Sequence, residues 1–219
     1  MIKLTPRLLC VAQAVENCGC FLDIGTDHAY LPAYLIENGI AKRAIASDIN
    51  PNPLLNAERT VADENLTGKI ELRLSDGFKN IKPDEAEEIA VAGMGGLMIA
   101  EMLNTTAWLK NSKYRLVLQP MTHFEDVRRA LNENGFEITD EQTALEGKRV
   151  YLVISARYSG KTEEKPAYWY YTGKLAGSKK ESDIAFCNKV IKALTKKYEG
   201  SGDKTSLEAL RSIENAKSN

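Results

Sequence analysis

Apolar and polar residues alternate along the first two thirds of the chain in blocks that predict strands and helices in turn. Short apolar runs that end at Gly, Asp or Gln-Pro signals predict strands at 20–24, 43–47, 70–74, 88–92 and 114–118. Helical spacing predicts a helix from Thr5-Pro6 onward and further helices at 29–38, 50–64, 96–103 and 123–134. Strands that alternate with helices indicate parallel βαβ units, in a sheet covered on both faces.

Two further apolar segments, 136–144 and 149–157, follow without a helix between them. Glu146-Gly147-Lys148 separates them, which predicts an antiparallel hairpin at the sheet edge. The expected fold is therefore α/β, with a Rossmann-like, doubly wound and mainly parallel sheet of seven strands. This domain is expected to span residues 1–158.

The pattern changes after Tyr158, where a polar connection leads into segments of helical spacing at 179–198 and 206–216. Gly200-Ser-Gly202 separates these segments, so residues 159–219 are expected to form an antiparallel, coiled-coil-like helical hairpin. Within 157–219, 13 Lys and Arg face 8 Asp and Glu, whereas the whole chain has a net charge of −1. A basic tail is found in proteins that contact RNA, but charge alone favours a solvated helical face.

Composition narrows the class of protein. With 43% hydrophobic and 27% charged residues the chain resembles ordinary globular proteins, and no run approaches the ~20 apolar residues of a membrane helix. We therefore expect a cytoplasmic protein with no membrane partner. A monomer is expected, although the sequence does not determine the oligomeric state. Cys18-Gly-Cys20 is open to interpretation as a metal or redox pair, but reduced buried thiols are favoured. The two histidines, His28 and His123, lack ligand spacing, so no metal is expected.

Acidic residues and glycines follow four of the predicted strands. They are Asp23 to Asp27, Asp48, Asp76-Gly77 and Gly93 to Gly96. Ligands of open parallel sheets bind outside the carboxyl ends of the strands. A carboxylate at Asp48 is placed to accept ribose hydroxyls, and one at Asp76 to accept an adenine amino group. The set together predicts a nucleoside site.

The loop after the first strand distinguishes between nucleoside cofactors. Gly25 is followed by Thr26-Asp27-His28, so the G-x-G-x-x-G spacing of dinucleotide sites is absent, as is the P-loop pattern. An acidic loop with one glycine repels a pyrophosphate and attracts the cationic amino and sulfonium groups of S-adenosylmethionine. The sequence therefore favours a methyl donor over NAD.

The same residues resemble a known family, the bacterial tRNA (adenine-22-N1)-methyltransferases. The resemblance covers about residues 3–157 and is carried by Leu4-Thr-Pro-Arg7-Leu8, Asp23-Ile-Gly-Thr-Asp-His-Ala-Tyr-Leu-Pro32, Asp76-Gly77, Ala92-Gly-Met-Gly-Gly96 and Leu118-Gln-Pro120. Two positions depart from the family: Met121 stands where Asn is frequent, and Asp48 stands where Glu is frequent. The resemblance implies a class I methyltransferase domain, a C-terminal helical pair, S-adenosylmethionine as cofactor, S-adenosylhomocysteine as product and tRNA as partner.

The resemblance also implies roles for individual residues. Those expected around the cofactor are Gly25, Thr26, Asp27, His28, Asp48, Ile49, Asp76, Gly77, Gly93 and Met94. Asp23 is expected either to bind the cofactor or to brace the loop. Arg7 is expected either to pair with the methionine carboxylate or to be a solvated surface residue.

Methylation at adenine N1 uses a ring-nitrogen lone pair of the substrate as nucleophile, so it requires alignment and fixed polar groups, with the base extruded. Asp27, His28 and Tyr30 are the expected catalytic residues, with Tyr30 either stacking on the base or packed within the protein. Gln119 is expected to orient the base. Expected RNA contacts are Arg128, Arg129, Lys179, Lys180, Lys189, Lys192, Lys196 and Lys197. Tyr168-Trp-Tyr-Tyr171 is expected either to stack on bases or, preferably, to dock the tail.

Two other functions remain open from the residues. One is a class I methyltransferase that acts on another RNA, a protein or a small molecule. The other is a nucleoside-binding regulatory protein without catalysis. The chain lacks the Asn/Asp-Pro-Pro-Tyr/Phe pattern of exocyclic-amine adenine enzymes and a Pro-Cys pair suited to pyrimidine C5 attack. Both absences favour a ring nitrogen as the target.

Overall fold

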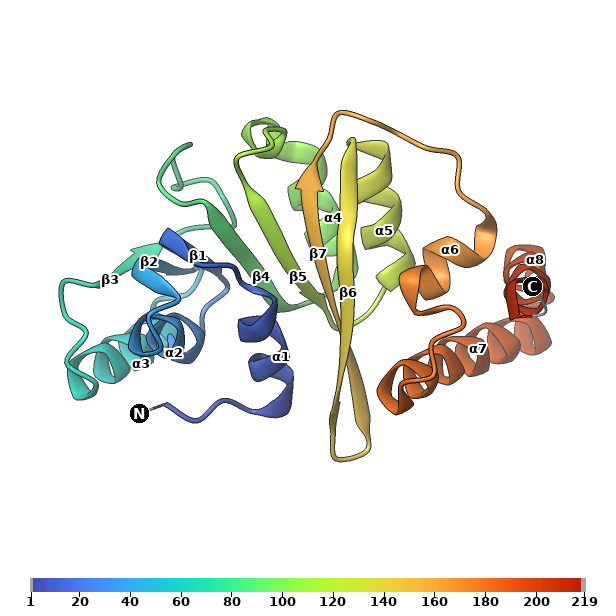
Figure 1. The fold of residues 1–219 in the computed structure, drawn as a ribbon, viewed down its shortest axis with the longest axis horizontal. Coiled ribbons are helices and arrows are strands. Elements are labelled where there is room, and N and C mark those ends of the chain that lie inside the picture. The colour runs from blue at the N-terminus through green and yellow to red at the C-terminus, as the bar shows by residue number, and fades with distance from the viewer. Residues whose placement is uncertain (1, 218–219) are drawn as a thin grey trace.

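The computed structural model describes residues 2–217, and its seven strands form one sheet in the order β3-β2-β1-β4-β5-β7-β6 (Figure 1). The first five strands are parallel, and β7 runs antiparallel to both β5 and β6. The strands are β1 (Cys18–Ile24), β2 (Ala41–Asp48), β3 (Ile70–Leu74), β4 (Glu88–Met94), β5 (Arg115–Pro120), β6 (Phe136–Glu146) and β7 (Arg149–Tyr158). The predicted α/β class and the seven-stranded, mainly parallel sheet are confirmed.

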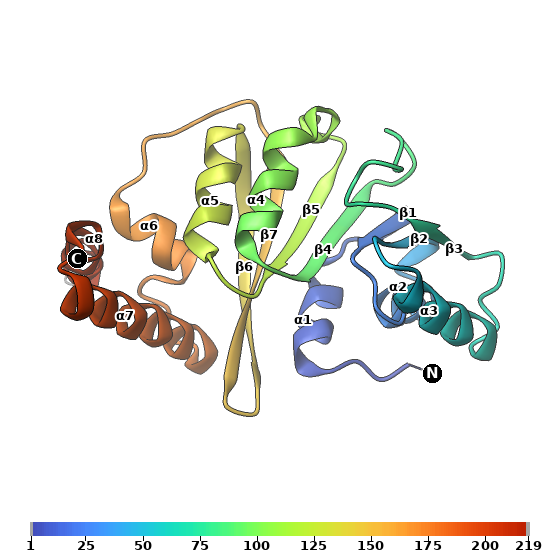
Figure 2. The same ribbon diagram turned by 180° about the vertical axis from the view of Figure 1, so that it is seen from behind.

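The helices cover the sheet in two layers (Figures 1 and 2). One layer packs into the same apolar cluster as Phe21, Ala44 and Val117, and consists of α1 (Pro6–Ala14), α2 (Tyr30–Glu37) and α3 (Pro51–Asp63). The opposite layer consists of α4 (Gly96–Thr105), η1 (Ala107–Leu109) and α5 (Phe124–Glu133). Apolar burial on both faces explains why the central strands appear in the sequence as continuous apolar runs.

The order of the strands reverses between β1 and β4. The chain builds β2 and β3 on one side of β1 and then crosses to β4 on the other side. A crevice opens at such a switch point, beyond the carboxyl ends of the two strands. The predicted glycines Gly25 and Gly93 stand at this point, directly after β1 and within the last residues of β4.

The predicted hairpin is present and consists of β6 and β7, with the turn at Gly147. β7 lies between β5 and β6, so β6 is the edge strand. In Figure 1 the hairpin projects beyond the carboxyl ends of β4 and β5, between α1 and the first long helix of the tail.

The tail contains one helix that the pattern did not predict. Tyr168 to Tyr171 lie in α6 (Ala167–Thr172), which continues into η2 (Gly173–Leu175) and is followed by α7 (Glu181–Ser201) and α8 (Lys204–Lys217). Tyr168, Trp169 and Tyr171 pack against the domain core, as expected of a docking seam. The break lies within the predicted Gly200-Ser-Gly202, because α7 continues to Ser201 and the left-handed residue that ends it is Gly202, with φ of +67°.

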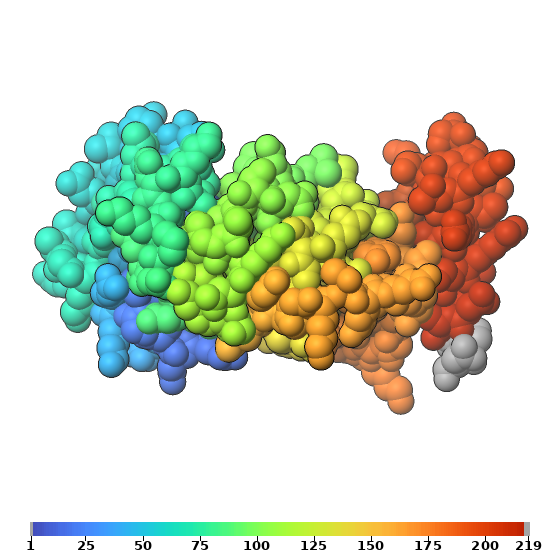
Figure 3. Space-filling view, turned by 90° about the horizontal axis from the view of Figure 1, so that it is seen from above, coloured from blue at the N-terminus to red at the C-terminus, as the bar shows by residue number. Residues whose placement is uncertain are grey.

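The tail shares its hydrophobic core with the sheet. Phe186, Val190 and Ile213 belong to the same buried cluster as Ile89 and Leu118. Figure 3 shows the tail as a lobe at one end of the molecule, opposite the N-terminal helices. The division into 1–158 and 159–219 therefore stays a prediction, since burial is continuous across it. Of the helices in residues 2–217, none is long and apolar enough to cross a membrane.

Candidate functional site

The loop that follows β1 is shaped around Gly25. The N–H groups of Gly25 and Thr26 both donate to the carbonyl of Ser47, at 2.8 Å each, which fixes the loop to the end of β2. Gly25 has φ of +80°, and a Cβ there would lie 2.2 Å from the terminal methyl of Met94. The positive φ favours glycine at this position, and a Cβ would require the flexible end of Met94 to move.

A cavity of about 580 Å³ opens on one side of Gly25. Asp48, Ile49, Asp76 and Gly77 line it, as the sequence predicted of a nucleoside site. Asp48 is half-buried at the end of β2, and its Oδ1 accepts the N–H of Asn50 at 2.7 Å. The remaining walls include Phe78, Met98, Met102 and Trp108. A carboxylate at one end and an apolar, aromatic wall at the other suit a ribose and a purine.

Sequence reasoning missed these apolar walls. Phe78 and Trp108 meet edge to face, with ring centroids 5.5 Å apart. They come from the loop after β3 and from η1, neither of which has a periodic pattern that marks it as part of a site. In the sequence, their aromatic character is the feature that could have indicated a role as cavity walls.

A second cavity, of about 410 Å³, opens on the other side of Gly25. Gly25 lines both cavities, so the two adjoin at the end of β1. The predicted residues that line the second one are Arg7, Asp23, Thr26, Asp27, His28, Tyr30 and Gly93. The sequence-predicted cofactor residues thus fall into two groups around one glycine.

Asp23 is the buried acid of the second cavity. Burial raises the pKa of Asp23 to about 6, against a hydrogen bond from Thr26 that lowers it. The nearby Asp48 raises this pKa further, whereas Arg7 lowers it. Because burial disfavours the ionised form of this carboxylate, a cation beside it stabilises that form. The second cavity therefore suits an ammonium or sulfonium group.

Arg7 is fixed from two sides at the start of α1. Its Nη1 donates to Oε1 of Gln119 at 2.9 Å, and its guanidinium lies 5.8 Å from the ring centroid of Tyr151. Gln119 is fully buried in β5, and the N–H of Gly93 donates to the same Oε1 at 3.1 Å. The expectation that Gln119 contacts the base therefore disagrees with the structure: its side chain is turned inward and positions Arg7 and Gly93.

Asp27, His28 and Tyr30 form an exposed platform at the rim of the second cavity. The rings of His28 and Tyr30 stack with centroids 4.9 Å apart and planes 7° from parallel. Asp27 Oδ2 lies 3.5 Å from His28 Nε2. Ala29 has φ of +53°, and its N–H donates to Thr26 Oγ1 at 3.2 Å. This left-handed residue turns the chain sharply before α2 begins at Tyr30, which brings both rings to the same side.

The predicted RNA-contacting residues separate into buried and exposed ones. Arg128 is fully buried, with Nε 2.7 Å from Glu141 Oε1 and Nη1 bonded to the carbonyls of Tyr170 and Tyr171. The expectation of an RNA contact at Arg128 is therefore wrong, because the side chain instead joins α5 to the tail. The exposed residues are Arg129, Lys179, Lys180, Lys189, Lys192, Lys196 and Lys197.

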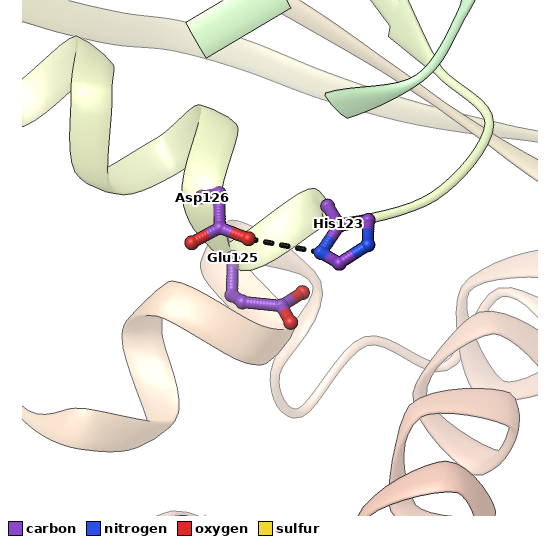
Figure 4. A group of neighbouring side chains, drawn as sticks. All are labelled: His123, Glu125 and Asp126. Carbon is purple, nitrogen blue, oxygen red and sulfur yellow. Dashed lines mark hydrogen bonds and ion pairs between the residues drawn. The ribbon is translucent and has the colours of Figure 1, made fainter. Parts of the chain in front are cut away.

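One group of potential metal ligands occurs among the described residues. His123, Glu125 and Asp126 bring three ligand atoms within 4.8 Å of one another at the start of α5 (Figure 4). His123 Nδ1 lies 3.1 Å from Asp126 Oδ2. Acidic residues in the first turn of a helix are stabilised by its dipole, which accounts for this group without an ion.

Known proteins match both the methyltransferase region and nearly the whole chain. Residues 4–154 match a family described as a methyltransferase domain. A Bacillus subtilis protein named tRNA (adenine(22)-N(1))-methyltransferase is 36% identical over 190 residues, which cover 86% of this chain and 80% of that protein.

Two solved structures with bound ligands are similar over nearly the whole chain. A Streptococcus pneumoniae protein in complex with S-adenosyl-L-methionine has a TM-score of 0.85 at 28% identity, covering 99% of this chain and 100% of that one. M. capricolum TrmK in complex with S-adenosyl-homocysteine has a TM-score of 0.80 at 27% identity, covering 98% and 96%. Fold and site together define a class I, S-adenosylmethionine-dependent methyltransferase. Within that class, the chain belongs to the tRNA (adenine(22)-N(1))-methyltransferase family.

Proposed function

We propose that this chain transfers a methyl group from S-adenosylmethionine to N1 of an adenine in tRNA, at position 22. The observation that carries the proposal is the 36% identity over 190 residues with the Bacillus subtilis enzyme of that name. The pair of cavities joined at Gly25 is consistent with it, because one suits an adenosine and the other a cationic amino acid. We further propose that the chain acts as a monomer.

Each half of the cofactor has its own set of residues. Asp48 accepts hydrogen bonds from the ribose hydroxyls, while Asp76, Gly77 and Ile49 surround the adenine. Asp23 faces the amino group and Arg7 the carboxylate of the methionine part. Gly25, Thr26, Asp27, His28, Gly93 and Met94 complete the enclosure between the two halves. When bound, S-adenosylmethionine supplies a methyl group whose carbon bonds to adenine N1 as its bond to sulfur breaks.

The protein contributes alignment and charge to the reaction. Tyr30 and His28 provide a stacked aromatic platform for the extruded base, since 41% of the Tyr30 surface is exposed. The product base carries a positive charge, which develops as the ring nitrogen is alkylated. Asp27, at the rim, stabilises that charge and orients the base. The nucleophile is the lone pair of N1, so no protein nucleophile takes part.

The exposed cations provide the remaining RNA contacts. Arg129, Lys179, Lys180, Lys192 and Lys196 all lie on α5 or on the tail and bind phosphates. Such contacts add affinity that depends on salt and carries little sequence information. Selection of adenine 22 therefore depends on the site at Gly25 and on the shape of the tRNA.

Labelled methyl transfer tests the proposal directly. The chain is incubated with methyl-labelled S-adenosylmethionine and a tRNA transcript with adenine at position 22, and the nucleosides are analysed by mass spectrometry. The expected product is 1-methyladenosine, and a transcript with guanine at position 22 should remain unlabelled. Label in another nucleoside, or none in tRNA while another substrate accepts methyl, would refute the assignment. Failure to bind S-adenosylmethionine would leave only a non-catalytic function.

A further inference from the structure

A basic groove of about 520 Å³ lies between the β6–β7 hairpin and α7, outside both cavities of the site. Lys148 and Arg149 line it from the hairpin, and Lys189 and Lys192 line it from α7. Phe124 and Tyr151 add aromatic walls. None of the described residues that line this groove is acidic, although the chain as a whole has a net charge of −1. The groove therefore concentrates positive charge on an otherwise balanced protein.

The groove borders the methyl-transfer site. Tyr151 lines the groove, and the guanidinium of Arg7, in the second cavity, lies 5.8 Å from the centroid of its ring. Pro120 and Met121 line the groove as well, and they directly follow Gln119, which holds Arg7. Figure 1 shows the hairpin and the start of α7 at the same end of the sheet as the carboxyl ends of β4 and β5. A ligand in the groove is thus adjacent to one in the site.

The surroundings of Lys189 favour the binding of an anion in the groove. Its Nζ lies 5.0 Å from the ring centroid of Phe124 and 3.5 Å from the carbonyl of Val150. Partial burial of the ammonium group lowers the pKa of Lys189. An ammonium group that is partly desolvated, with no carboxylate among the groove's lining, gains most from a phosphate placed beside it.

We propose that this groove holds the sugar–phosphate backbone of the tRNA next to the extruded adenosine. Lys148, Lys189 and Lys192 bind phosphates, while the exposed Met121 supports the apolar face of a ribose or base. The proposal rests on the proposed function, because a nucleic-acid substrate is what matches cations interleaved with aromatic rings. It assigns part of RNA binding to the hairpin, which lies outside the basic tail.

The test compares two double variants that make the same change in charge. Lys148→Gln/Lys192→Gln removes one cation from each wall of the groove. Lys42→Gln/Lys69→Gln removes two exposed cations near the opposite edge of the sheet, next to the starts of β2 and β3. Binding of a tRNA transcript is measured by fluorescence anisotropy across a salt series, together with KM and kcat for methyl transfer.

The groove variant should bind tRNA about 10-fold more weakly, and its salt slope should fall by about 1.5, since each lost phosphate contact contributes roughly 0.7–0.9. KM for tRNA should rise by a similar factor, while S-adenosylmethionine affinity stays within about twofold of the parent protein. The control variant should match the parent. The single variant Lys148→Gln should show about half the change in slope, which a role confined to the tail does not predict.

Equal behaviour of the groove and control variants would overturn the proposal, and so would unchanged tRNA binding by Lys148→Gln. A transcript with guanine at position 22 separates this proposal from the proposed function. It should bind with the same dependence on the groove although it is not methylated. If the adenine-22 transcript also binds through the groove but remains unmethylated, the proposed function fails and the groove assignment stands.

Discussion

The guanidinium of Arg7 and the side-chain amide of Gln119 are joined by a hydrogen bond of 2.9 Å, although the two residues are 112 positions apart. The same Gln119 oxygen accepts the N–H of Gly93 at 3.1 Å. One buried side chain thus holds a cation from α1 and the backbone of β4 at the edge of the second cavity. The position of Arg7, which we propose faces the methionine carboxylate, is therefore set by a residue that does not line the cavity.

Replacement of Gln119 by Leu should weaken cofactor binding. The substitution preserves the approximate volume of the side chain but leaves the Gly93 N–H without an acceptor and frees Arg7. An Arg7 side chain that is no longer held at the cavity binds the cofactor less well, and a loss of about 1.4 kcal/mol from that interaction raises the Kd for S-adenosylmethionine about 10-fold in calorimetric titration. Gln13→Leu, on the exposed side of α1, is the matched control and should bind normally. An unchanged Kd for Gln119→Leu would contradict the positioning role.

Gly25→Ala should abolish measurable cofactor binding. The new Cβ would lie 2.2 Å from the Met94 methyl, and φ is +80° at this position. Gly147→Ala provides the control, because Gly147 also has positive φ, of +59°, yet nothing lies within 4 Å of its Cβ position. The control should lose about 1–2 kcal/mol of stability in thermal unfolding and keep its cofactor affinity. Normal affinity in Gly25→Ala would show that the cofactor does not lie against this residue.

The fold could be predicted from the sequence because each strand has a pattern of its own. The apolar runs and the Gly, Asp and Pro residues that end them are local signals, and they gave the sheet and the placement of Gly25, Asp48 and Asp76. Burial of polar residues is not a local signal. The sequence predicts that Gln119 orients the base and that Arg128 contacts RNA, and nothing in the local pattern indicates that either side chain is buried. Their partners, Arg7 and Glu141, come from distant elements.

The aromatic helix α6 shows a second limit of pattern reasoning. Its six residues are too few for a helical period to appear, so the sequence indicates only a cluster of aromatic residues from Tyr168 to Tyr171. The groove between hairpin and α7 shows a third limit. Lys148 and Lys189 lie 41 positions apart and face one groove only because β7 returns along β6.

Asp23 should make cofactor binding depend on pH. Its pKa of about 6 in the folded protein exceeds the ordinary value of 3.8, because burial disfavours the charged form. A bound cation favours ionisation, so affinity for S-adenosylmethionine should rise as pH increases from 5 to 7. Binding near pH 6 should release a proton, which is detected by calorimetry in two buffers of different ionisation enthalpy. Asp23→Asn should abolish both the pH dependence and the proton release.

The raised pKa of Asp23 should also affect the stability of the cofactor-free protein, which should fall as pH rises, whereas cofactor affinity should rise. Since the folded pKa lies above the unfolded one, the native state binds more protons between pH 4 and 6, and stability falls as pH rises through this window. Asp23→Asn should therefore unfold at a higher temperature than the parent at pH 7.5, and at a similar temperature at pH 4. A lower unfolding temperature at pH 7.5 would indicate that the ionised carboxylate mainly braces the loop.

Adjacent arginines on α5 should differ sharply in their effect on stability. Arg128 and Glu141 form an ion pair of 2.7 Å with both side chains fully buried, and Glu141 also accepts the N–H of Lys174 at 2.6 Å. Gly173 is packed so closely that a Cβ would lie 2.0 Å from Glu141 Oε2. Arg128→Leu leaves a buried carboxylate without its cation, and the expected loss is about 3–5 kcal/mol in chemical denaturation.

Arg129→Ala is the control, because Arg129 is exposed and its guanidinium lies 4.5 Å from the centroid of the Tyr170 ring. It should cost about 1 kcal/mol or less. Adding Glu141→Gln to Arg128→Leu removes the unpaired charge while the new amide oxygen still accepts from Lys174. The double variant should therefore recover a large part of the loss. If the double variant is as unstable as Arg128→Leu alone, the stability at this junction comes from the arginine's bonds to Tyr170 and Tyr171 rather than from the ion pair.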